Sequence, residues 1–137
     1  MDQTGPVRRE GFLGSEAVSA LLNDPGGFDP ASVLTLAGEH YGPVHGHSTQ
    51  ALLLRPGQAL ARLLPKTARG GFLLDLGPSG WRSEWGGLLL FQGAEGRVQG
   101  YRPVPGALTL FPASAAPMIS LIAPQGRNRA SILGWWN

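Results

Sequence analysis

Turn-forming residues divide most of this chain into short apolar segments at nearly even intervals. Glycine and proline supply 21 and 12 of the 137 residues, and both interrupt helices and strands. Five turn signals follow one another: Pro56-Gly57, residues 77–80, residues 93–96, Pro105-Gly106 and residues 124–126. Even spacing of short strands is typical of an antiparallel sandwich or barrel. The spacing therefore predicts a mainly β protein of the jelly-roll type.

The segments between these turns are the predicted strands, because they are short and rich in leucine, isoleucine, valine and aromatic residues. They comprise residues 33–36, 50–55, 71–76, 87–91, 107–111, 119–122 and 130–136, with weaker candidates at 59–64 and 97–102. One short helix is predicted over residues 15–22, where Ala17, Val18, Leu21 and Leu22 share a face. The length fits one domain. We divide it into an N-terminal extension with the helix, residues 1–32, and a β domain, residues 33–137.

Composition excludes several classes of protein. Hydrophobic residues make up 42% and charged residues 15%, which indicates a globular chain. The net charge is only +2, Lys66 is the sole lysine, and no basic run occurs, so a nucleic-acid partner is not expected. The absence of cysteine excludes disulfides and thiolate metal sites. No apolar run approaches the roughly 18 residues of a membrane helix, and the start does not read as a signal peptide, so we expect a cytoplasmic protein without membrane association.

Three blocks in the second half of the chain resemble one known family. They are Gly71–Gly77 continued by Gly80-Trp81 and Trp85-Gly86-Gly87, then Pro105–Pro112, then Arg127–Trp136. In this order over residues 50–137, they resemble the prolyl 4-hydroxylase-like branch of the 2-oxoglutarate/iron(II) oxygenases. The resemblance implies a double-stranded β-helix, a jelly-roll barrel, preceded here by the short helix. In that family a His-x-Asp pair and a distal His hold iron(II), and a basic residue binds 2-oxoglutarate.

The residues of this chain depart from the metal-binding part of that pattern. The resemblance places Leu63 and Pro65 at the positions of the His-x-Asp pair, and Met118 at the distal His. None of the three is a suitable ligand for iron(II), and residues 48–137 contain no histidine. The resemblance therefore implies a barrel that has lost its iron ligands, and neither iron(II) nor 2-oxoglutarate is expected as a cofactor.

Arg129 and Ser131 match the part of the pattern that binds the far carboxylate of 2-oxoglutarate. An arginine within an apolar strand needs an anionic partner. Two interpretations stay open: Arg129 binds the carboxylate of a ligand, or it forms a salt bridge with Asp75 or Glu84.

His45 and His47 are the remaining metal-like pair. On a strand, an i, i+2 pair places both rings on one face, as in cupin-like metal sites. Glu39 or His40 could supply a third ligand. We favour the simpler interpretation, polar residues in a glycine-rich loop before a strand.

The four tryptophans indicate which parts of the chain pack in the core and which contact a partner. Trp81 and Trp85 are expected to pack the barrel wall. The adjacent Trp135 and Trp136 should point to opposite faces of the last strand, one into the core and one toward a protein partner or a second copy.

Taken together, these residues favour a non-catalytic oxygenase-fold protein that acts as a binding, regulatory or partner-subunit domain. The alternative is an active iron(II)/2-oxoglutarate dioxygenase, or a cupin-like metalloprotein that uses His45 and His47.

Overall fold

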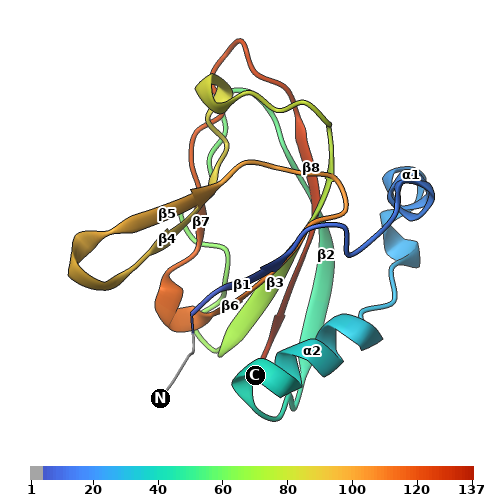
Figure 1. Cartoon of the computed structure of the whole chain (residues 1–137), viewed down its shortest axis with the longest axis vertical. Helices are drawn as coiled ribbons and strands as arrows, with labels where there is room; N and C mark the ends of the chain where they lie inside the picture. Colours follow the sequence, from blue (N-terminus) through green and yellow to red (C-terminus); the bar gives the residue numbers. More distant parts are fainter. Residues whose placement is uncertain (1–4) are drawn as a thin grey trace.

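The computed structural model describes residues 5–137 as two antiparallel sheets and two α-helices (Figure 1). The larger sheet has the order β1-β6-β3-β8-β2 and the smaller sheet the order β5-β4-β7. In chain order the strands are β1 (Val7–Arg9), β2 (His47–Leu54), β3 (Gly70–Gly77), β4 (Leu89–Gln92), β5 (Val98–Tyr101), β6 (Leu108–Pro112), β7 (Met118–Ile119) and β8 (Arg129–Trp136). The helices are α1 (Ser15–Asn23) and α2 (Ala31–Tyr41), with 3-10 turns η1 (Pro25–Gly27), η2 (Ser83–Trp85), η3 (Ala94–Gly96) and η4 (Ala113–Ala115). This mainly β, jelly-roll architecture confirms the predicted fold class.

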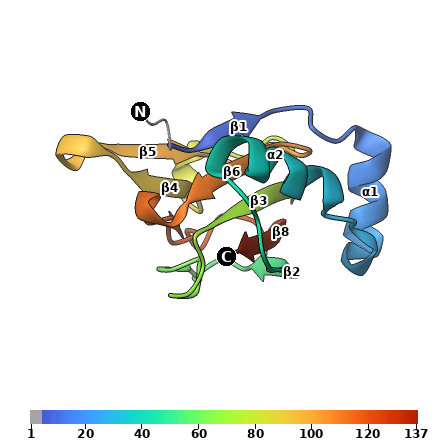
Figure 2. The same cartoon turned by 90° about the horizontal axis from the view of Figure 1, so that it is seen from below.

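The centre of the larger sheet is buried on both faces, and because side chains alternate along a strand, each central strand supplies residues to both cores. In β3, Leu73 packs between the two sheets, whereas Phe72 and Leu74 pack toward the helices. The helices contribute Val18 and Val33 to this outer core, and Figure 2 shows both helices beside the larger sheet. Burial of each large apolar side chain stabilises the fold by about 1.5–3 kcal/mol. The two cores together hold β3 and β8 at the centre of the molecule.

The hairpin of β4 and β5 extends away from the body of the protein (Figures 1 and 2). Its two strands pair from Leu89 opposite Tyr101 to Gln92 opposite Val98. At the base, Leu89 and Phe91 enter the inner core. Beyond them, residues 97–100 are exposed. The hairpin therefore closes one side of the barrel only at its base.

Residues 33–36 form part of helix α2, so the predicted strand there is wrong. The whole segment from Ala31 to Tyr41 is helical, and its buried residues Val33 and Ala37 are one helical turn apart. The Asp29 carboxylate accepts a hydrogen bond from the Ala31 N–H at 3.0 Å and helps the helix begin. A four-residue apolar run does not distinguish a strand from one turn of a buried helix.

Smaller differences concern other segments. Residues 59–64 form no strand and contribute one bridge, Leu60 to Ile119. β1 was not predicted, and it joins the sheet beside β6. The helix predicted over residues 15–22 is confirmed as α1. β1 and α2 both pack on the β domain, and α2 crosses the predicted division between residues 32 and 33. Within residues 5–137 no helix has the length and apolar character needed to span a membrane.

Candidate functional site

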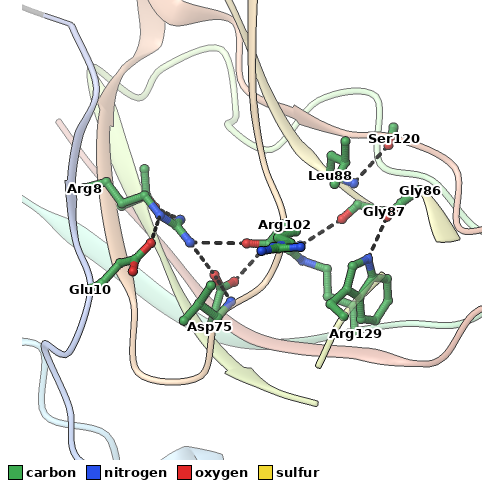
Figure 3. Close-up of polar contacts among 12 residues, drawn as sticks. Arg8, Glu10, Asp75, Gly86, Gly87, Leu88, Arg102, Ser120 and Arg129 are labelled. Atoms are coloured by element: carbon green, nitrogen blue, oxygen red, sulfur yellow. Dashed lines mark hydrogen bonds and ion pairs between the residues drawn. The ribbon is translucent and has the colours of Figure 1, made fainter. Parts of the chain in front are cut away.

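A buried ion pair joins the two central strands of the larger sheet. Asp75 lies near the end of β3, and Arg129 is the first residue of β8. Both side chains are 1% exposed, and the Arg129 Nη2 lies 2.9 Å from the Asp75 Oδ1 (Figure 3). The Arg129 Nη1 donates a second hydrogen bond, of 2.8 Å, to the carbonyl oxygen of Gly87. The guanidinium is thus held on one side by a carboxylate and on the other by the backbone before β4.

A second arginine reaches the same carboxylate from the edge of the sheet. The Arg8 Nη2, from β1, lies 3.7 Å from the Asp75 Oδ2, and its Nη1 donates to the Thr109 Oγ1 at 2.8 Å. Its guanidinium stacks over the Tyr101 ring at 4.8 Å and lies 3.7 Å from Glu10. Arg8 therefore seals the outer end of the cluster seen in Figure 3.

Burial opposes the charged forms of both partners. It raises the pKa of Asp75, while the charges of Arg129 and Arg8 and a hydrogen bond from the Val104 N–H act in the opposite direction. Burial also lowers the pKa of Arg129, and the Asp75 charge opposes that change. Each charge is therefore tolerated in the interior chiefly because its partner is present.

Of the two interpretations of Arg129, the structure shows a salt bridge to Asp75. Glu84 is two-thirds exposed and lies 3.6 Å from Arg82 instead. Ser131 lies opposite Asp75 in the β3–β8 pairing and is 2% exposed. Within residues 5–137, the Ser131 Oγ and the Arg129 Nε are buried without a hydrogen-bond partner.

The three positions that the sequence resemblance assigns to iron ligands lie on two neighbouring segments. The Leu63 N–H donates a 3.3 Å hydrogen bond to the carbonyl oxygen of Pro117, next to Met118. Leu63 is 4% exposed and belongs to the core between the sheets, Met118 is partly buried, and Pro65 is exposed. None of these side chains has a nitrogen or oxygen donor, and iron(II) in such sites needs imidazole and carboxylate ligands. These residues do not fit an iron centre.

His45 and His47 are exposed at the start of β2. Only His47 belongs to the strand, because β2 begins there, while the His45 N–H donates to the Asn137 carbonyl. The two rings therefore do not lie on one strand, since His45 precedes β2 and His47 is its first residue. Among residues 5–137, no three histidine, aspartate or glutamate side chains cluster in a way that could hold a metal.

The tryptophans pack much as predicted. Trp81 is 3% exposed, contacts Trp85 edge to face at 5.2 Å, and donates a hydrogen bond to the Gly86 carbonyl. Trp136 is fully buried and Trp135 partly buried. The wall-packing role of Trp81 and the opposite orientation of the last two tryptophans are confirmed.

Sequence reasoning missed two members of the cluster, Arg8 and Thr109. A three-residue edge strand with two arginines gives no periodic signal, and its pairing with β6 is nonlocal. Thr109 lies within the strand predicted over residues 107–111, and its 1% exposure results from the packing of the assembled sheets. Thr109 interrupts an otherwise continuous apolar run over residues 107–111, and such a run is typical of a strand that is buried on both faces.

Two facing antiparallel sheets in this topology define the chain as a double-stranded β-helix protein. No protein-family profile matches the sequence, and no curated protein matches it either. Solved structures do match: the chain has a TM-score of 0.79 and 25% identity to a Pseudomonas putida prolyl-4-hydroxylase, over 98% of this chain and 86% of that one.

Two further structures give the same result. A Trichoplax adhaerens prolyl hydroxylase in complex with a hypoxia inducible factor peptide has a TM-score of 0.75 at 17% identity, over 98% of this chain and 84% of that one. A viral collagen prolyl hydroxylase from Paramecium bursaria chlorella virus 1 has a TM-score of 0.67 at 12% identity, over 99% and 94%. The predicted resemblance is confirmed: this chain has the fold of the prolyl 4-hydroxylase-like 2-oxoglutarate/iron(II) oxygenases.

Proposed function

We propose that this chain is a non-catalytic member of the oxygenase fold that acts as a binding, regulatory or partner-subunit domain. The observation that supports the proposal is the buried Arg129–Asp75 pair. The family resemblance gives Arg129 the role of binding the far carboxylate of 2-oxoglutarate. Here a carboxylate of the chain itself already occupies that guanidinium, at 2.9 Å and without exposure to solvent. We place this protein in the cytoplasm as part of the same proposal.

The apolar residues at the ligand positions support the same conclusion. Leu63 packs in the core with Leu73 and Leu133, so the place that the resemblance assigns to a metal ligand is filled by hydrocarbon. A dry apolar environment does not stabilise a divalent ion. Iron(II) and 2-oxoglutarate would therefore each lack the residues that bind them.

We expect no iron-dependent release of succinate from 2-oxoglutarate. The test incubates the purified chain with iron(II), ascorbate and 2-oxoglutarate and measures succinate. The alternative, an active dioxygenase or a cupin-like metalloprotein, is tested with the His45→Ala/His47→Ala double variant and a metal analysis of both proteins. Succinate release by the unaltered chain, abolished in the double variant, would contradict the proposal and place a metal at those histidines.

A second experiment tests whether Arg129 retains an affinity for carboxylates. In the Asp75→Ala variant, the carboxylate of acetate can take the place of the missing side-chain carboxylate. With a dissociation constant of about 10 mM, 100 mM acetate would stabilise the variant by roughly 1.4 kcal/mol, which raises the melting temperature by about 3–6 °C. The measurement compares acetate with chloride at equal ionic strength.

The control for this rescue is Leu73→Ala. Leu73 lies on the same face of β3 as Asp75 and is also 1% exposed, so its removal leaves a cavity without an unpaired charge. We expect no specific acetate effect on this variant or on the unaltered chain. Equal stabilisation of Asp75→Ala and Leu73→Ala by acetate would show that Arg129 has no carboxylate preference.

A further inference from the structure

Strand β2 is a long, unprotected edge of the larger sheet. It spans eight residues, pairs only with β8 and ends the strand order of its sheet. The opposite edge, β1, has three residues and two of them are arginines. In the smaller sheet, β7 has two residues, and β5 has four, with Arg97 before it and Arg102 after it. Short length and charge are the usual protections of an edge strand, and β2 has neither.

The η1 turn lies close to β2 but donates no backbone hydrogen bond to the strand and accepts none from it. The first five residues of β2 are all exposed, on both faces of the sheet, and none of residues 47–54 is an aspartate, glutamate, lysine or arginine. Within residues 5–137, no backbone hydrogen bond connects residues 48–53 to any segment other than β8. The strand therefore offers a row of unpaired N–H and C=O groups without charge repulsion.

The hydrogen bonds at the two ends of the β2–β8 pairing show which backbone groups of β2 point away from β8. At one end of the ladder, the Asn137 N–H donates to the Gly46 carbonyl. At the other end, the Arg55 N–H turns away from β8 and donates to the Gln58 Oε1 at 2.8 Å. Since successive residues of an antiparallel pair alternate in direction, the backbone groups of Thr49, Ala51 and Leu53 point away from β8.

We propose that two copies of this chain associate through β2, pairing the two strands antiparallel about a two-fold axis. If corresponding faces of the two sheets are to lie on the same side of the joined sheet, odd-numbered residues of one β2 strand must stand opposite odd-numbered residues of the other. Of the two longest such overlaps, the one that leaves no outward residue of β2 unpaired places Gln50 opposite Gln50, Thr49 opposite Ala51, and His47 opposite Leu53 of the second copy. In this register every outward N–H and C=O of the strand is paired, and the two larger sheets form one continuous sheet. A two-fold arrangement closes at two copies.

An apolar patch beside the edge fits the same partner. Leu53 is 50% exposed and lies opposite Ala130 in the sheet. Ala130 and Leu22, which is 49% exposed, line one shallow hollow together with Pro78. Exposed leucines next to an unpaired edge are a liability for a monomer. Edge pairing would cover Leu53 and continue the contact along this patch.

The tryptophan-rich C-terminal strand, β8, would take part in this dimer through its neighbour β2. β8 is hydrogen-bonded on both sides, to β3 and to β2, so it has no free edge of its own. Its partly exposed Trp135 lies opposite Ser48 of β2. The dimer would thus form through the neighbour of the tryptophan-rich strand.

The test is sedimentation velocity of the full chain across micromolar concentrations, with Ala51→Pro as the first variant. Proline at position 51 removes an outward N–H and leaves the β2–β8 hydrogen bonds in place, which an edge strand tolerates. Because the symmetry duplicates the loss, we expect dissociation of the dimer to become at least about thirtyfold easier. Ala51→Lys should have a similar effect, and Ser114→Lys, exposed on η4, is the control for added charge.

Amide exchange gives a second measurement on the unaltered chain. The amides of Thr49, Ala51 and Leu53 should become protected as concentration rises, whereas those of Gln50 and Leu52 should be protected at every concentration by β8. A chain that stays monomeric throughout the range, or a dimer that persists in both Ala51 variants while their fold is intact, would overturn the proposal. Neither outcome bears on succinate release, so this inference and the proposed function are tested separately.

Discussion

Replacing Arg129 with methionine will lower the free energy of unfolding by about 3–5 kcal/mol. The substitution leaves Asp75 buried, with Arg8 at 3.7 Å as its remaining charged neighbour. It also leaves the carbonyl of Gly87 without its buried donor. Asp75→Leu should have an effect of similar size, because it leaves the Arg129 guanidinium unpaired. Urea denaturation followed by tryptophan fluorescence measures both changes.

The double variant Asp75→Leu/Arg129→Met separates this explanation from a general packing defect. With both charges removed, no buried charge is unpaired, and we expect most of the lost stability to return. Arg82→Met is the matched control, because Arg82 and Glu84 form an ion pair at 3.6 Å with both side chains about two-thirds exposed. Its effect should stay below about 1 kcal/mol. A double variant whose loss equals the sum of the two single losses would show that the pair itself contributes nothing.

The β portion of this fold is predictable from sequence because its turns are local. Pro56-Gly57 and Pro105-Gly106 fix strand ends through backbone preferences of the residues themselves, and the strands they bound appear within a few residues of the expected places. The segment at residues 33–36 is different. Its helical spacing of Val33 and Ala37 is apparent only over the whole of residues 31–41, and these two side chains pack in the core against the larger sheet.

Part of the candidate site was also predictable from the sequence. An arginine in an apolar strand must have an anionic partner, so Arg129 and the candidate partner Asp75 could be named from sequence. Which of two acids would be chosen depends on the β3–β8 register, and Arg8 arrives through a pairing between segments about one hundred residues apart. Such contacts follow from the assembled sheet alone.

The fold of an oxygenase and its chemistry depend on different features of a chain. The arrangement of the sheets agrees with an oxygenase barrel, because it belongs to the fold. Catalytic chemistry belongs to individual side chains grafted on it, and the sequence resemblance assigns Leu63 and Met118 to the places of the metal ligands. In the barrel interior Arg129 forms an ion pair with Asp75, and this pair is the observation on which the proposed non-catalytic role rests.

Gly86→Ala will destabilise the chain by about 3–5 kcal/mol. Gly86 has φ +67° and ψ −143°, a conformation that is essentially restricted to glycine and costs other residues about 1–3 kcal/mol. An added Cβ would also collide with the backbone carbonyl oxygen of Leu121. That carbonyl is fixed by a 3.1 Å hydrogen bond from the Gly87 N–H, and the Trp85 carbonyl accepts from the Ala123 N–H at 2.7 Å. The collision therefore has to be relieved by moving backbone, which costs about 1–3 kcal/mol more.

The position of Gly86 connects this prediction to the buried pair. The next residue, Gly87, presents the carbonyl that accepts from Arg129 at 2.8 Å, so a shift of this turn weakens a buried charge-assisted hydrogen bond as well. Gly80→Ala is the control: Gly80 also has a positive φ, of +72°, but its added Cβ meets no atom within 4 Å. That variant should lose only about 1–2 kcal/mol. If thermal and urea denaturation gave equal losses for the two alanine variants, the close approach of Leu121 to Gly86 would not constrain the fold, and the turn would not be what holds the Gly87 carbonyl on Arg129.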